Sequence, residues 1–319
     1  MHILITGMTG FVGGYLAESL LSQGDGTVYG LSRSGKWPAN LVHLKQRVQL
    51  HSCDLCDVAT TERLLRELEP QLIFHLAGYA HAGRSLREPD AAWAGNLDAT
   101  RSLYTAVERW GGRPRIVYAG SGLIYGEGQS AAERFAEDAP LRPANPYAAS
   151  KAAADLLSYQ CARVQGLDIM RARPFNHIGP RQSTDYAVPN FARQIAAIER
   201  GEQPPILETG NLAACRDLTD VRDVVEAYRL LAKHGQAGEA YNIARGQSFS
   251  MQTVVERLLA RSSVRVEVRP RSELLRATDA AITQGDASRL RQQTGWQPRY
   301  SLDDTLAHIL AYWREQPMT

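Results

Sequence analysis

The stretch that decides the fold is His2-Ile-Leu-Ile-Thr6-Gly7-Met-Thr-Gly10-Phe-Val-Gly13. Residues 2–6 form a short apolar run typical of a buried strand, and an amphipathic pattern from residue 12 to residue 23 predicts a helix. The three glycines permit backbone geometry and close approach that a Cβ would block. Because the first N–H groups of a helix lack intrahelical acceptors, a strand, turn and helix in this order favour a phosphate-binding turn over a plain tight turn.

Further apolar runs alternate with helical patterns through the first half of the chain. They predict strands at 27–31, 48–52, 72–76, 115–119 and 167–172, and helices at 58–68, 92–109 and 147–164. The pattern is irregular beyond Pro174, except for a helix at 223–233 and a strand at 241–243. This order is typical of an α/β, doubly wound parallel sheet of the Rossmann type with a smaller, mostly helical C-terminal part interleaved.

This reading divides the chain into two interleaved domains. Residues 1–173 plus 220–245 would form the nucleotide-binding domain, and residues 174–219 plus 246–319 the substrate-binding domain.

Composition excludes several classes of protein. The 319 residues carry a net charge of +2 with 22% charged residues, which argues against a nucleic-acid-binding stripe. Mean hydropathy is −0.31, and no apolar run approaches the roughly 18 residues of a membrane helix. The N-terminus lacks the features of a secretory signal. We therefore expect a soluble, cytoplasmic protein without a membrane or nucleic-acid partner.

The four cysteines are most simply read as reduced thiols. Cys53-x-x-Cys56 could be half of a metal or redox site, but no second pair or clustered histidines complete it. We expect no bound metal, and we expect His75 and His81 to be structural.

The end of the second predicted strand distinguishes the two nicotinamide dinucleotides. An NAD site usually has a carboxylate there, whereas this strand runs into Ser32-Arg33-Ser34-Gly-Lys36. Arg33, helped by a neighbouring hydroxyl or by Lys36, suits a 2′-phosphate. The sequence thus favours NADP(H), with NAD(H) as the alternative. The other interpretation is that Arg33 and Lys36 are solvated loop charges that bind no ligand.

Other residues along the predicted sheet edge complete the cofactor site. Asp54-Leu55 follows the third strand, where a carboxylate can accept from the adenine amino group, and His75-Leu-Ala-Gly78 brings small residues to the fourth. The predicted cofactor-binding residues are Gly7, Thr9, Gly10, Phe11, Val12, Gly13, Arg33, Asp54, Leu55, Leu76, Ala77 and Gly78.

The predicted catalytic residues lie around Asn145-Pro-Tyr147-Ala-Ala-Ser-Lys151, which reads as a helix start with Asn145 as cap. Tyr147 and Lys151 are four residues apart and share one helical face. A lysine ammonium beside the phenol would lower the pKa of Tyr147, which makes this residue a candidate general acid/base. Ser121, just beyond the fifth strand, could bind the same substrate oxygen and complete a Ser–Tyr–Lys triad.

Together these motifs resemble the extended short-chain dehydrogenase/reductase family, in its nucleotide-sugar branch. The stretches 173–182, 188–194, 210–217, 285–288 and 295–298 narrow the resemblance to the GDP-mannose 4,6-dehydratases and GDP-4-keto-6-deoxy-D-mannose reductases. The resemblance implies a GDP-sugar substrate and a homodimer or homotetramer built partly on the face of the catalytic helix.

Within that branch, the loop after Ser121 separates the two reactions. The dehydratases have an acidic residue two places after the catalytic Ser or Thr, where this chain has Leu123. Losing a positioned general base costs on the order of a hundredfold or more, so Leu123 favours NADPH-dependent reduction of a 4-keto group. A 4,6-dehydratase or 4-epimerase that recruits another proton-transfer residue stays open, as does an NADP-binding sensor without catalysis.

The resemblance also implies individual roles. Ser121 would polarise the C4 carbonyl, Tyr147 would protonate its oxygen, and Lys151 would hold the nicotinamide ribose. Asn176 would contact the substrate near its phosphates and His177 the nicotinamide end of the cofactor. Arg216, Arg276 and Asp279 would bind the nucleotide. Ala80 departs from the polar residue common at the sugar, which leaves the sugar contact and the exact substrate open.

Overall fold

The first strand lies inside a seven-stranded parallel sheet in the computed structural model, which describes residues 1–128, 130, 133–271 and 282–316. The strand order is β10-β6-β5-β4-β1-β2-β3. The strands are β1 (His2–Thr6), β2 (Thr27–Ser32), β3 (Val48–Ser52), β4 (Leu72–His75), β5 (Arg115–Ala119), β6 (Asp168–Pro174) and β10 (Ala240–Ile243). Strands β2 and β3 are added on one side of β1, and β4, β5 and β6 on the other. The winding of the chain therefore reverses between β1 and β4, which is where such folds bind ligands.

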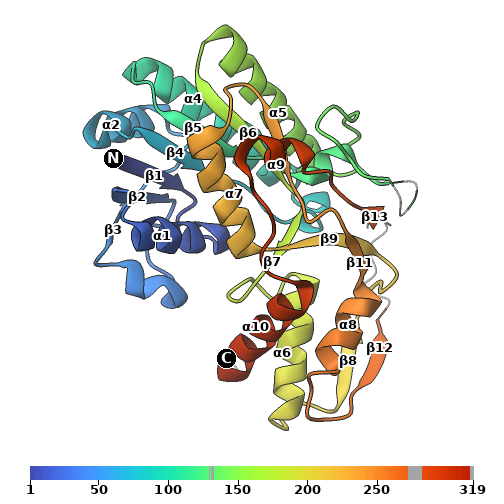
Figure 1. The fold of residues 1–319 in the computed structure, drawn as a ribbon. Coiled ribbons are helices and arrows are strands. Elements are labelled where there is room, and N and C mark those ends of the chain that lie inside the picture. The colour runs from blue at the N-terminus through green and yellow to red at the C-terminus, as the bar shows by residue number, and fades with distance from the viewer. Residues whose placement is uncertain (129, 131–132, 272–281, 317–319) are drawn as a thin grey trace.

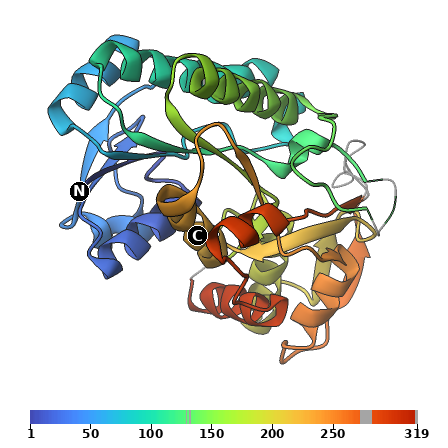
Figure 2. The same ribbon diagram turned by 45° about the horizontal axis from the view of Figure 1, so that its top comes forward.

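Helices cover both faces of this sheet (Figures 1 and 2). α1 (Phe11–Gln23) and α7 (Val221–His234) pack on one face, and α2 (Val58–Leu68), α4 (Ala99–Trp110) and α5 (Pro146–Val164) on the other. Successive residues of β1 enter different cores: Ile3 and Ile5 join the core beneath α1, and Leu4 joins the core beneath α2 and α4. This double burial explains why the strands are continuously apolar.

The continuous helix predicted for residues 92–109 is wrong. The structure has α3 (Pro89–Trp93), a π-helical turn η3 (Ala94–Asp98), and only then α4. The wider turn holds the buried Asn96, whose Nδ2 donates to Ser150 Oγ of α5 at 2.9 Å. The interruption places a polar contact between helices beside the sheet edge, as π-turns often do.

The second half of the chain adds short strands that the sequence did not reveal. β7 (Asn176–Ile178), β9 (Cys215–Asp220), β11 (Ser248–Ser250) and β13 (Ile282–Thr283) form one small sheet, and β8 (Ile206–Thr209) and β12 (Glu267–Pro270) pair in another. Helices still contain more of this second part than strands do, but the expectation of a mostly helical part left these strands out. Short strands paired with distant partners carry little periodic signal.

Helices complete this part of the molecule. They are α6 (Ala187–Glu199), α8 (Met251–Leu259), α9 (Ser288–Thr294) and α10 (Leu302–Glu315). Residues such as Ile195, Leu207 and Leu306 bury a separate core between α6, α8 and α10. The division into two interleaved domains at 174, 220 and 246 stays a prediction. None of the helices in the described residues combines the length and apolar character of a membrane span.

Candidate active site

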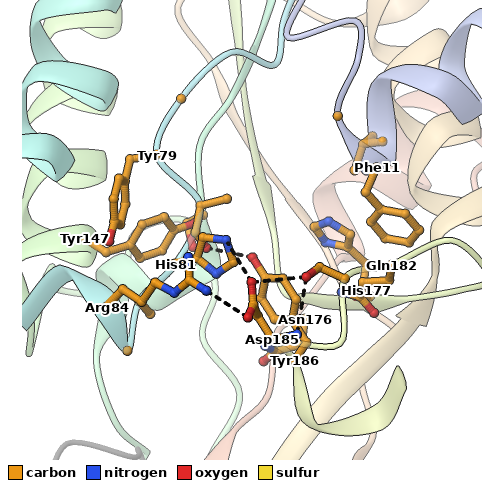
Figure 3. Close-up of a pocket in the computed structure, with 18 of the residues that line it drawn as sticks. Phe11, Tyr79, His81, Arg84, Tyr147, Asn176, His177, Gln182, Asp185 and Tyr186 are labelled. Atoms are coloured by element: carbon orange, nitrogen blue, oxygen red, sulfur yellow. Dashed lines mark hydrogen bonds and ion pairs between the residues drawn. The ribbon is translucent and has the colours of Figure 1, made fainter. Parts of the chain in front are cut away.

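A cavity of about 1160 Å³ opens at the carboxyl ends of the sheet strands. One wall comes from the turns that follow β1 to β5, and the other from residues 174–191, β8, β9 and their neighbours. Figure 3 shows Tyr79, Arg84 and Tyr147 on one side of the cavity, and Phe11, His177 and Gln182 on the other. A ligand in this cavity would therefore contact both halves of the chain.

The turn between β1 and α1 lines the cavity, with Gly7, Thr9, Gly10, Phe11, Val12 and Gly13 at its surface. Gly7 has φ +72°, and a Cβ there would lie 2.7 Å from the Ala77 nitrogen. A Cβ on Gly13 would lie 2.6 Å from the Gly7 oxygen. Gly10 brings no capping side chain to α1, so the first-turn N–H groups are presented to a ligand. These features fit a pyrophosphate.

The edge formed by β2 and β3 suits the adenosine half of a dinucleotide. Arg33, Asp54 and Leu55 line the cavity there. Ser34 and Lys36 lie outside the lining, so any help for Arg33 at this wall comes from Ser32. The end of β2 offers a guanidinium and a hydroxyl in place of a carboxylate, which fits a 2′-phosphate. Leu76, Ala77 and Gly78 continue the wall toward the catalytic residues.

Ser121 and Tyr147 line the cavity, and their side chains are hydrogen-bonded to each other. Ser121 begins the short helix η4 (Gly122–Tyr125), and its Oγ accepts from Leu123 N at 3.1 Å. Asn145 caps α5, as predicted, by accepting from Ala148 N at 2.9 Å. The Tyr147 backbone N–H donates to Ser85 Oγ at 3.1 Å. Two hydrogen bonds thus fix the first turn of α5, from which the phenol projects.

The expected lowering of the Tyr147 pKa by Lys151 is wrong for the protein alone. Burial raises the pKa of Tyr147, and a hydrogen bond with Ser121 opposes that rise. Lys151 is turned away from this role, because its Nζ donates to Ala119 O at 2.8 Å. The phenol therefore carries its proton at neutral pH, as a proton donor must.

Lys151 lies behind the cavity wall. It is buried, and it does not belong to the described lining, although its Nζ is 3.3 Å from the point a Cβ of Gly78 would occupy. Burial lowers its pKa to about 8. Its contact with a cofactor ribose stays a prediction.

Leu123 lines the cavity two residues after Ser121, where a dehydratase would need an acid. In the described lining, the carboxylates belong to Asp54, Asp185 and Glu208. Asp54 lies at the adenosine edge, Asp185 pairs with Arg84 at 2.8 Å, and Glu208 pairs with Arg271 at 3.5 Å. Two residues after Ser121, this site therefore has the apolar side chain of Leu123 where a dehydratase would have a carboxylate.

Of the residues predicted for the substrate and for the nicotinamide end of the cofactor, those that the structure describes lie on β7 and β9. Asn176, His177 and Arg216 line the cavity. The His177 ring stacks on Phe11 with centroids 6.1 Å apart, and burial lowers its pKa. Arg276 and Asp279 lie outside the described residues.

The sequence did not reveal a group of side chains that crosses the cavity (Figure 3). This cross-cavity cluster consists of His81 and Arg84 from the loop after β4, and Asp185 and Tyr186 from the loop before α6. Asp185 pairs with Arg84 and lies 3.8 Å from His81 Nε2. The His81 ring stacks on Tyr186 at 5.2 Å, and the Tyr186 hydroxyl donates to Ala80 O at 3.0 Å.

His81 was expected to be structural, yet it lines the cavity. A histidine close after a predicted cofactor-binding strand was the available signal for it. Nothing local paired that histidine with residues a hundred positions later. Over the described residues, no group of three His, Cys, Asp or Glu side chains could hold a metal ion.

A doubly wound sheet with a glycine turn and a Ser–Tyr pair at its edge defines the extended short-chain dehydrogenase/reductase class. The chain belongs to the GDP-mannose 4,6 dehydratase family, whose model matches residues 4–309.

Relatives with several activities share this fold. The chain is 32% identical to GDP-6-deoxy-D-mannose reductase of Pseudomonas aeruginosa, over 99% of this chain and 98% of the relative. It is 28% identical to UDP-glucose 4-epimerase of Mycolicibacterium smegmatis, over 99% of each.

Two solved structures are also similar. The structure of RMD from Pseudomonas aeruginosa complexed with NADPH is 32% identical, with a TM-score of 0.85 over 98% of this chain and 99% of that one. UDP-glucose 4-epimerase of Thermus thermophilus complexed with NAD is 28% identical, with a TM-score of 0.87 over 99% of each.

Proposed function

We propose that this protein is an NADPH-dependent reductase of the C4 keto group of a GDP-4-keto-6-deoxy-hexose, forming a GDP-6-deoxy-mannose (rhamnose-type) product. The observation that carries the proposal is the Ser121–Tyr147 pair beside Leu123: the site has a hydroxyl proton donor, and an apolar side chain where a dehydratase has an acid. The similarity to a GDP-6-deoxy-D-mannose reductase supports the same substrate class. The cofactor is NADP(H), with NAD(H) as the alternative.

The reaction needs one hydride and one proton. NADPH, held by the Gly7–Gly13 turn and the sheet edge, would supply the hydride that reduces C4 and would leave as NADP⁺. Ser121 donates a hydrogen bond to the carbonyl oxygen and orients it. Tyr147 transfers its phenolic proton to that oxygen, which completes the product hydroxyl, and then recovers a proton from water. Because burial raises the pKa of Tyr147, the phenol holds its proton until the carbonyl oxygen of the substrate becomes a strong base during the reduction.

The remaining roles concern binding. The turn at Gly7–Gly13 would hold the pyrophosphate, Arg33 the 2′-phosphate, and Asp54 and Leu55 the adenine. Lys151 would reach the nicotinamide ribose past Gly78. Asn176 and Arg216 would contact the diphosphate of the sugar nucleotide, and we propose that Arg276 and Asp279 contact its nucleotide.

The test is a direct assay with purified protein, GDP-4-keto-6-deoxy-mannose and NADPH. We expect loss of NADPH absorbance together with a product two mass units heavier than the keto sugar, since one hydride and one proton are added. Tyr147→Phe should reduce kcat by about a hundredfold or more without changing the Kd for NADPH. Conversion of GDP-mannose without added reduced cofactor would instead indicate a dehydratase or an epimerase.

We infer that the protein is cytoplasmic and assembles as a homodimer or homotetramer. The exposed apolar side chains Leu156 and Tyr159 on α5 support a contact on the catalytic-helix face. Light scattering of the purified protein measures the state directly. Substitution of both residues by Ser should shift it toward monomer.

A further inference from the structure

Besides its N-terminal turn, helix α1 has one side that contacts the segment after β6. Phe11, Tyr15 and Glu18 are four and three residues apart, so they share one face. That face packs against residues 174–182, the segment that leaves the sheet after β6. Phe11 stacks on His177 (Figure 3), and the Tyr15 hydroxyl donates to Pro180 O at 3.0 Å.

Glu18 joins this face to the segment by an ion pair with Arg181, and its Oε1 also lies 2.7 Å from His43 Nε2. Both of its carboxylate oxygens accept from Arg181, at 2.6 and 2.7 Å, and the guanidinium lies 4.0 Å from the Tyr15 ring centroid. Paired N–H···O bonds of this kind fix orientation as well as distance. The Arg181 side chain is 15% exposed and that of Glu18 32% exposed, so the pair is only partly screened by water.

Arg181 adopts a backbone conformation that this contact must support. Its φ is +69°, and among the described non-glycine residues only Glu69 also has a positive φ. Such a conformation is unfavourable for a residue with a Cβ. The bidentate pair with Glu18 and the stacking on Tyr15 hold it in place, so the turn at 179–182 is tied to α1.

Neither Glu18 nor Arg181 lines the cavity, whereas the segment between them and the active site does. Asn176 and His177 face the cavity, and Gln182 Nε2 donates to His177 O at 3.1 Å. Because β6 lies beyond β5 and Ser121, these residues belong to the reactive end of the cavity.

We propose that Glu18 and Arg181 are positioning residues that hold Asn176 and His177 in register with the phosphate-binding helix. The pair couples the turn that holds the dinucleotide to the segment that meets its nicotinamide end. The inference rests on the proposed function for the identity of the cofactor.

The test compares the binding of NADPH with that of 2′-phospho-ADP-ribose, which lacks only the nicotinamide. In Glu18→Gln we expect the Kd for NADPH to rise by up to about tenfold, because the free energy of the weakened charge-assisted hydrogen bond is an upper bound on the loss of positioning, while the Kd for 2′-phospho-ADP-ribose changes less than about twofold. Hydrogen exchange should quicken in residues 174–182, and kcat should fall. Equal losses for the two ligands, or no loss, would overturn the proposal.

Arg181→Gly keeps the test decisive if Glu18→Gln folds poorly. Glycine accepts a positive φ without strain, so this variant removes the guanidinium and relieves the backbone together. It should show the same difference between the ligands in a folded protein. Arg181→Lys, which keeps charge but loses the fork, should be intermediate.

Glu199→Gln is the matched control. Glu199 forms a similar two-bond pair with Arg314, at 2.7 and 2.8 Å, away from the cavity lining. This variant should leave both ligand affinities unchanged even where it lowers Tm. A ligand difference in Glu18→Gln without turnover of a keto sugar by the parent protein would reject the proposed function and retain the positioning pair.

Discussion

At the scale of single residues, Arg33 and Lys36 show how position in the cavity distinguishes two similar charges. Both are exposed cations in the loop after β2, but only Arg33 lines the cavity. The sequence indicated Arg33 as the partner of a 2′-phosphate, with Lys36 among its candidate helpers. Substitution of Arg33 therefore tests the cofactor contact, and substitution of Lys36 is its control.

Arg33→Ala should raise the KM for NADPH by about ten- to a hundredfold, since a hydrogen bond to a charged group contributes about 1.5–3 kcal/mol. The KM for NADH should change little, because NADH lacks the phosphate. Steady-state kinetics with both cofactors measure the ratio. Lys36→Ala should behave like the parent, and a comparable loss there would contradict the assignment of Arg33.

Lys151 makes a pH-dependent contribution. Its pKa is about 8 because it is buried, so its ammonium group is lost as the pH rises through that value. We expect kcat/KM for NADPH, which reports the free enzyme, to fall along a limb near pH 8. Tyr147, with its pKa raised, adds no limb below its ordinary value of about 10.

Lys151→Arg should be slower but lack this limb, because a guanidinium keeps its proton. Stability should move in the opposite direction. Between about pH 8 and the unfolded value of about 10.4, the unfolded lysine binds more protons than the folded one, so the parent gains stability relative to Lys151→Arg as the pH rises. If the fall of kcat/KM near pH 8 persisted in Lys151→Arg, the titrating group would be a residue other than Lys151.

At the scale of elements, local patterns predicted what local forces determine. The strands β1, β3 and β5 and the helix α2 have the predicted bounds, because their apolar residues are buried by neighbours close in sequence or by a regular sheet. The Ser121–Tyr147 pair was predictable from local signals as well: Ser121 comes just after the end of β5, and Tyr147 lies in the first turn of α5, whose start Asn145 marks.

Features that depend on distant partners were not predictable. His177 of β7 pairs with Thr219 of β9, and Arg84 binds Asp185, 101 residues later. The orientation of Lys151 is similar, since the carbonyl of Ala119 on another element determines it. A one-dimensional pattern gives no indication of such partners, so the cross-cavity cluster and the pKa of Tyr147 required the structure.

The cross-cavity cluster connects two elements, and its loss should affect substrate more than cofactor. Asp185→Asn removes the charge that pairs with Arg84 and faces His81, at nearly constant shape. For a partly exposed pair worth about 0.2–1 kcal/mol, we expect the KM for the sugar nucleotide to rise by up to about fivefold. Glu202→Gln, in an exposed pair with Arg200 away from the cavity, is the control. A loss confined to NADPH affinity would contradict this placement.

At the scale of the whole molecule, the cavity belongs to both halves of the chain. The dinucleotide would contact chiefly the sheet edge, and the sugar nucleotide chiefly β9 and the segment after β6. Asn176 and His177 lie where the two ligands would meet. A ligand that orders this segment would reduce the entropy that the second ligand must remove.

Binding of the two ligands should therefore be coupled. Either ligand alone at about a hundred times its Kd should stabilise the fold by about 2.7 kcal/mol. NADP⁺ and GDP, which cannot react together, should raise Tm by more than the sum of their separate shifts, and each should lower the other's Kd by about fivefold or more. Titration calorimetry in both orders checks that the two factors agree, as linkage requires. Strictly additive shifts would mean that the two walls of the cavity bind independently. A coupling that is lost in Arg181→Gly but kept in Glu199→Gln would locate its path at the contact between α1 and the segment that carries His177.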